Sequence, residues 1–244
     1  MLMGRCLLDR IKLICLPHAG GSSLIYNNWK KQLSSKIEIY SPELQGRGTR
    51  YKEEHPEKLN ILVNDIYKNI EKVLTDNDYA LFGHSMGALI VYELYKKIKS
   101  NNISLPKALF LSGMYPPPTN IKEFVHLYSD EQILEKIKKL GGTPKTILKN
   151  KRFMEYYIPI IRADYKMIET YEYKEIYLKI TEPTFIFSGK KDSIPKDLIM
   201  SWKNHTLFQP TYYEFDGGHF FIHENSKEVL NAIESILLHG GINS

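Results

Sequence analysis

The most informative segment of this 244-residue chain reads Tyr79-Ala80-Leu81-Phe82-Gly83-His84-Ser85-Met86-Gly87. A short apolar run ends in Gly-His-Ser-Met-Gly, and apolar side chains then recur at helical spacing, with Leu89, Ile90 and Leu94 among them. Strand, sharp turn and helix in this order form a nucleophile elbow, in which small neighbours allow strained backbone at the serine. The five letters alone would fit a simple glycine-rich turn. The flanking strand and helix therefore carry the prediction that Ser85 is a nucleophile.

Short β-rich runs bounded by glycine or proline alternate with amphipathic stretches along the chain. One amphipathic stretch, residues 59–74, carries leucine, isoleucine and valine on a single face. This alternation predicts an α/β protein with a mainly parallel sheet flanked by helices on both sides. The predicted strands are Ile11–Leu16, Ile37–Tyr40, Tyr79–Phe82, Ala108–Ser112, Thr184–Ser188 and Thr211–Phe215.

The alternation stops between about residues 116 and 181, where two helical patterns and no strand pattern occur. Ser129 and Gln132 form a capping box at the start of the first, and Gly141-Gly142 ends it. The second runs from Phe153 to about Thr170 and contains Pro159, which should kink it. We therefore expect one domain over residues 1–244, with residues 116–181 inserted as a helical lid over the catalytic edge.

A serine nucleophile needs a histidine base that is held by a carboxylate. Asp192 follows the strand Thr184–Ser188, and His219 follows the strand Thr211–Phe215, so both belong at the same sheet edge as Ser85. Asp216 is better explained as a turn residue. No carboxylate follows Ala108–Ser112 before Glu123, and the remaining histidines follow no strand or lie in the elbow and the first loop. These positions predict a triad of Ser85, Asp192 and His219.

Two backbone N–H groups should stabilise the oxyanion of the tetrahedral intermediate. The first is that of Met86, the residue after the nucleophile. The second should come from the loop Pro17-His18-Ala19-Gly20-Gly21-Ser22, with Ala19 as the preferred donor and His18 as the near alternative. A turn followed by a helix cap is an equally compatible function for the glycines of this loop.

Composition narrows the class of protein further. The net charge is +5, but lysine and arginine are spread along the chain, which argues against a nucleic-acid-binding protein. The N-terminus lacks the apolar stretch of a secretory signal, and no apolar run has the length of a membrane span. Cys6 and Cys15 suggest a reduced, cytoplasmic protein without disulfides. His223 lies four residues after His219 without further ligands, so we expect no metal site. We also expect no cofactor and a monomeric protein.

The motifs together resemble those of the type II thioesterases that accompany nonribosomal peptide and polyketide synthases, which have the α/β-hydrolase fold. The resemblance covers nearly the whole chain in order and spacing. It departs from the family at Gln45, where proline is usual, and at Asp192, where an acidic pair is common. The matching stretches are Leu16-Pro17-His18-Ala19-Gly20-Gly21, Gln45-Gly46-Arg47-Gly48-Thr49-Arg50, Gly83 to Gly87, Arg162-Ala163-Asp164-Tyr165 and Gly217-Gly218-His219-Phe220-Phe221.

This resemblance implies hydrolysis of acyl groups from the phosphopantetheine arm of an acyl or peptidyl carrier protein, with small acyl thioesters as further substrates. A general carboxylesterase or peptidase of the same fold, and a non-catalytic binding module, are the alternatives. In the lid, we expect Tyr156, Tyr157 and Tyr165 to line the acyl channel, although such rings also pack helices together. Residues 136–152 hold seven lysines and arginines and no acid, which suggests either a docking surface for an acidic carrier or a solvated face.

Overall fold

A six-stranded parallel sheet organises the computed structural model, which describes residues 10–76, 78–118, 123–143, 145–174 and 178–240. The strand order is β2-β1-β3-β4-β5-β6, and each neighbouring pair is parallel. All six predicted strands are confirmed, with ends that differ by at most two residues. The strands are β1 Ile11–Leu16, β2 Ile37–Tyr40, β3 Tyr79–His84, β4 Leu109–Ser112, β5 Thr184–Gly189 and β6 Thr211–Phe215.

Helices cover both faces of the sheet because side chains alternate along each buried strand. On β1, Ile14 and Leu16 face the core under α1 (Leu59–Asp76), α2 (Met86–Ser100) and α6 (Lys196–Met200). Leu13 and Cys15 face the opposite core, under α7 (Phe221–Glu224) and α8 (Ser226–His239). Tyr26 of the short helix η1 (Ser23–Tyr26) lies in that second core. The sheet is therefore buried on both sides, as its almost continuously apolar strands predicted.

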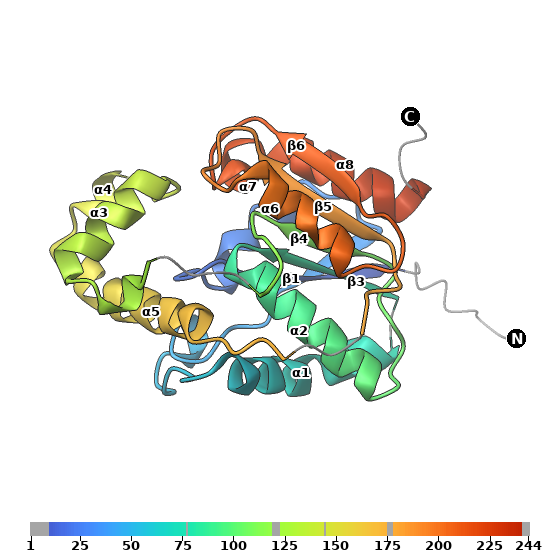
Figure 1. The fold of residues 1–244 in the computed structure, drawn as a ribbon, viewed down its shortest axis with the longest axis horizontal. Helices are drawn as coiled ribbons and strands as arrows, with labels where there is room; N and C mark the ends of the chain where they lie inside the picture. The colour runs from blue at the N-terminus through green and yellow to red at the C-terminus, as the bar shows by residue number, and fades with distance from the viewer. Residues whose placement is uncertain (1–9, 77, 119–122, 144, 175–177, 241–244) are drawn as a thin grey trace, which may run out of the picture.

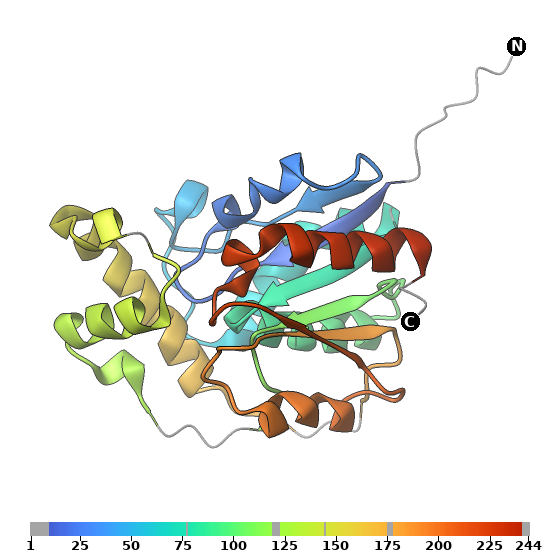
Figure 2. The same cartoon turned by 90° about the horizontal axis from the view of Figure 1, so that it is seen from above.

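Between β4 and β5 the chain forms a helical insertion that has a small apolar core of its own. Its elements are η4 (Val125–Leu127), α3 (Asp130–Leu140), α4 (Lys145–Leu148) and α5 (Lys151–Glu169). Ile133, Ile137, Met154 and Ile158 pack within it. Figures 1 and 2 both place α3, α4 and α5 beyond the carboxyl ends of the strands. The insertion thus lies at the edge of the sheet where Ser85 lies.

Two sequence predictions for this insertion are confirmed. Ser129 accepts from the Gln132 backbone N–H while the Gln132 side chain accepts from the Ser129 backbone N–H, which is the predicted capping box. The helix ends at Gly141, whose φ of 78° favours glycine. Pro159 lies inside α5, on its exposed side.

Among the described residues, no helix is both long and apolar enough to span a membrane.

Candidate active site

Ser85 occupies a sharp turn between β3 and α2, with φ 54° and ψ −120°. Few residues other than glycine adopt this region, so the surroundings must hold it in place. The backbone N–H of Ser85 donates to the Ser112 carbonyl at 2.7 Å. A Cβ on Gly83 would lie 2.0 Å from the Gly87 carbonyl oxygen, and one on Gly87 would lie 2.1 Å from that of Leu16. Both flanking glycines are therefore required by contact, as the elbow motif predicted.

Asp192 and His219 form a hydrogen-bonded pair in loops after β5 and β6. The His219 Nδ1 lies 2.8 Å from the Asp192 Oδ2, and the two side chains are 13% and 4% exposed respectively. The Lys191 backbone N–H donates to the Gly217 carbonyl at 2.9 Å, which ties the two loops together. Because a carboxylate accepts at Nδ1, the Nε2 atom of His219 is left as the basic nitrogen.

Ser85 and His219 line one cavity of about 40 Å³, and residues of the helical insertion line it as well. Tyr157 and Tyr165 of α5 also line it, as expected for residues of the acyl channel. Tyr156 does not line this cavity and is 49% exposed. Its assignment to the channel is wrong for this cavity, because one helical residue turns the side chain by about 100° from that of Tyr157. The other lining residues are His18, Ala19, Ile137, Leu140, Thr143, Ile161 and Phe220.

Ala19 and Met86, the predicted oxyanion donors, lie around Ser85. Met86 is the first residue of α2, where a backbone N–H has no carbonyl of its own helix to bind. Ala19 lines the cavity, whereas the N–H groups of the next two residues are engaged. Gly20 donates to the Asp164 Oδ2 at 2.7 Å, and Gly21 donates to the His18 carbonyl at 2.8 Å. This leaves Ala19 and His18 as candidates for the second donor.

Two further histidines surround His219, and burial keeps them neutral. Burial, with smaller contributions from His219 and His18, lowers the pKa of His84 well below its usual value. Burial also lowers the pKa of His18 to about 4. The His84 Nδ1 lies 2.9 Å from the Ser112 Oγ, and the ring centroids of His84 and His219 are 5.2 Å apart. Neutral neighbours avoid adding positive charge beside the candidate base.

The structure also brings together residues that reasoning from local pattern did not assign. Arg47 and Asp164 are 2% and 0% exposed, and form a two-pronged ion pair with both nitrogen to oxygen distances at 2.6 Å. Asp164 also accepts the Gly20 N–H beside the candidate oxyanion site. Both residues belong to motifs that the sequence analysis quoted only for their resemblance to a family. A pairing across 117 residues leaves no local signal.

The structure gives no support to Asp216 as the acid of the triad or to a metal site at His223. Asp216 is exposed and pairs with Lys190 at 2.9 Å rather than with His219. The His223 ring lies beside those of His18 and Phe220. Within the described residues, no group of three or more histidine, cysteine, aspartate or glutamate side chains is placed to hold a metal ion.

A family model, a related sequence and two solved structures each match most of this chain. A model of the thioesterase domain family matches residues 11–237. The gramicidin S biosynthesis protein GrsT of Aneurinibacillus migulanus is 30% identical over 91% of this chain and 86% of its own. The crystal structure of ClbQ from the colibactin NRPS/PKS pathway is 33% identical, with a TM-score of 0.88 over 93% of this chain and 97% of that one. The type II thioesterase BorB from the borrelidin biosynthetic cluster is 32% identical, with a TM-score of 0.85 over 93% of each chain.

Proposed function

Because the chain belongs to the thioesterase domain family, we propose that it hydrolyses acyl groups from the phosphopantetheine arm of carrier proteins of a nonribosomal peptide or polyketide synthase. Its parallel sheet and strained elbow are those of an α/β-hydrolase fold. The observation that carries the proposal is the Asp192–His219 pair at 2.8 Å, because His219 lines the same cavity as Ser85. We assign the reaction to the cytoplasm, and the free, buried thiol of Cys15 is compatible with that.

In the proposed acylation step, the Ser85 Oγ attacks the thioester carbonyl while the His219 Nε2 takes the hydroxyl proton. Asp192 holds the imidazole in the required tautomer and stabilises its charged form. The carbonyl π electrons move onto oxygen, which the N–H groups of Met86 and Ala19 stabilise. Collapse of the intermediate breaks the carbon–sulfur bond. A thiol with a pKa near 8.5 leaves as a thiolate far more readily than an alcohol leaves as an alkoxide.

Deacylation repeats the same chemistry with water. The imidazolium of His219 returns its proton to the departing thiolate, and the neutral ring then takes a proton from water as that water attacks the acyl-Ser85 ester. The second tetrahedral intermediate collapses to a carboxylic acid as the His219 imidazolium gives its proton to the departing Ser85 Oγ, which restores the hydroxyl. Neither acylation nor deacylation needs a cofactor in this mechanism, because His219 accepts and returns the proton in each step.

We propose that the helical insertion serves as a lid. The cavity of about 40 Å³ is far smaller than the roughly 300–1,000 Å³ of pockets that hold ligands of drug size. Leu140 and Thr143 line it from the end of α3 and the loop that follows. An acyl-pantetheine arm would therefore need this part of the insertion to move outward before it reaches Ser85.

We further propose that the start of α5 is the docking surface for the carrier protein. Within the basic run, Lys136 pairs with Glu123, and Lys138 pairs with Glu135 at 2.5 Å, which reduces the charge that a partner would meet. The exposed cations at the start of α5 are Lys149, Lys151 and Arg152. Phe153 and Tyr156, next to them, are 36% and 49% exposed. This mixture of positive charge and exposed rings suits an acidic, helical partner.

The test of the proposed function compares two substrates that carry the same acyl group. We expect a higher kcat/KM for an acyl-phosphopantetheinyl carrier protein than for the corresponding p-nitrophenyl ester, with Ser85→Ala inactive on both. A general esterase would show the opposite preference. Failure of a fluorophosphonate to label Ser85 would remove the catalytic assignment altogether and favour a binding module.

A further inference from the structure

The carboxylate of Asp164 connects the insertion directly to the loop that carries the candidate oxyanion donor. Asp164 lies on α5 and is fully buried. Its Oδ2 accepts the Gly20 backbone N–H at 2.7 Å and an Arg47 nitrogen at 2.6 Å, while its Oδ1 accepts a second Arg47 nitrogen at 2.6 Å. Gly20 directly follows Ala19, so this bond fixes the peptide next to the donor.

Arg47 holds the same loop from a second side. Its guanidinium donates to the Gly21 carbonyl at 3.1 Å as well as to Asp164. Although burial alone would lower the pKa of Arg47, the adjacent Asp164 carboxylate raises it, so this arginine stays charged. Glu43 holds the residue that follows this loop. Its carboxylate accepts the Ser23 backbone N–H at 3.1 Å and the Ser23 hydroxyl at 2.9 Å.

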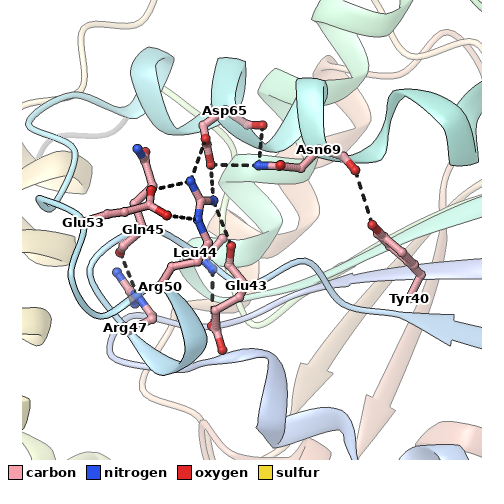
Figure 3. Close-up of polar contacts among 9 residues, drawn as sticks. All are labelled: Tyr40, Glu43, Leu44, Gln45, Arg47, Arg50, Glu53, Asp65 and Asn69. Carbon is pink, nitrogen blue, oxygen red and sulfur yellow. Dashed lines mark hydrogen bonds and ion pairs between the residues drawn. The ribbon is translucent and has the colours of Figure 1, made fainter.

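The loop that carries Arg47 is itself anchored to α1, as Figure 3 shows. Arg50 donates to both oxygens of Asp65 at 2.6 and 2.9 Å, and to Glu53 at 2.5 and 2.7 Å. It also donates to the Glu43 carbonyl at 3.2 Å. The Arg50–Asp65 ion pair therefore ties this loop to α1, and the separate Arg47–Asp164 pair ties it to α5.

The segment around Gly20 packs tightly against α5. Gly20 has a φ of 77°, and a Cβ built on it would lie 2.6 Å from the Ile161 Cγ1 and 3.0 Å from the Tyr157 hydroxyl. Gly20 and Gly21 have no side chain to hold this part of the loop, so its position depends on these contacts. A donor displaced by about 1 Å can cost about 10²-fold in rate.

We propose that Asp164 is a positioning residue that holds the Ala19 N–H in place for the oxyanion through Gly20 and Arg47. This inference rests on the proposed function and adds a role for the insertion in catalysis. It makes α5 a fixed part of the active site, so the opening for substrate belongs to α3 and the loop after it. Stability does not require such a pair, since well-packed apolar residues often replace buried ion pairs without loss.

The test is the double variant Arg47→Met/Asp164→Leu, which removes the ion pair and keeps the site filled. We expect kcat per fluorophosphonate-titrated active site to fall at least tenfold, with KM within about twofold, because only the transition state uses the oxyanion donor. The Ki of an arylboronic acid, which forms a tetrahedral adduct with Ser85, should rise by a similar factor. A purely structural role would lower the melting temperature and the fraction of titratable sites. It would leave the kcat per titrated site and the Ki of the arylboronic acid unchanged.

A matched control is Arg50→Met/Asp65→Leu, which removes an ion pair of the same type from the same loop but touches neither Gly20 nor Gly21. We expect its kcat and boronic acid Ki to stay within about twofold of wild type. Asp164→Asn keeps an acceptor for the Gly20 N–H and should raise the Ki by a smaller factor; it serves if the double variant does not fold. A wild-type Ki in Arg47→Met/Asp164→Leu, or in Asp164→Asn if the double variant does not fold, would overturn the proposal. Absence of Ser85 labelling in the wild-type protein would instead overturn the proposed function.

Discussion

The role of Asp192 as the acid of the triad can be tested against that of a nearby aspartate, Asp216. It is 4% exposed and contacts the His219 Nδ1, whereas Asp216, three residues before His219, is exposed and contacts Lys190. We predict that Asp192→Asn lowers kcat by about 10²–10⁴-fold, because an amide at this position no longer fixes the tautomer. Asp216→Asn is the control and should keep the wild-type kcat. Equal effects of the two substitutions in a steady-state assay would contradict the assignment.

His18 and His84 predict a pH dependence of stability with a defined sign. The pKa of His18 is lowered by burial to about 4 from an ordinary value of 6.5, and that of His84 is lowered in the same direction. Between these values the unfolded chain binds more protons than the folded one, so stability is present above pH 6.5 and is lost as the pH falls toward 4.

The measurement is the melting temperature between pH 7.5 and 4.5. We predict a steady fall over the acidic part of this range, and a shallower fall for His18→Gln, because that side chain does not take up a proton. A variant with the same slope as wild type would show that His18 is not one of the groups responsible.

The start of α5 gives a prediction at the level of an element. Lys151 and Arg152 occupy its first turn, where the positive end of the helix dipole disfavours cations by about 0.3–1 kcal/mol each. Changing Lys149, Lys151 and Arg152 to glutamate should therefore not lower the melting temperature. We predict that it lowers kcat/KM on an acyl carrier protein, most strongly at low salt, and leaves a small acyl thioester unaffected.

The control for this prediction reverses three exposed lysines elsewhere, Lys68 and Lys72 on α1 and Lys227 on α8, which changes the net charge equally. If both triple variants lose the same activity on the carrier, total charge rather than this surface sets the rate. If neither loses activity at low salt, the start of α5 is not the docking site.

Elements with a strong repeating pattern were predictable from the sequence, and short or polar ones were not. The strands were predictable because strands of a sheet covered on both faces form short apolar runs, and the capping box set the start of α3. The short helix α4 was missed because four residues carry no period. Helix α5 begins at Lys151 rather than Phe153, because the Asn150 side chain accepts the Phe153 N–H at 3.1 Å and caps it earlier.

At the scale of the whole molecule, parallel strands gather their loops at one edge, which is why chain order alone predicted the positions of Ser85, Asp192 and His219. The Arg47–Asp164 pair escaped this reasoning, because its members come from a loop and from the insertion, and neither follows a strand of the sheet. The sheet thus explains the candidate triad, and the insertion explains the support of the candidate oxyanion loop.

The most direct test of the central proposal is the intact mass of the protein after it reacts with an acyl carrier protein. The wild-type protein, quenched with acid during turnover, should carry the acyl-enzyme, whereas His219→Ala lacks the base for both acylation and deacylation and should not form it. We predict one added acyl group on the quenched wild-type protein, located on Ser85 by peptide mapping, and none on Ser85→Ala. An acyl group on another residue, or wild-type hydrolysis by Ser85→Ala, would contradict the proposed mechanism.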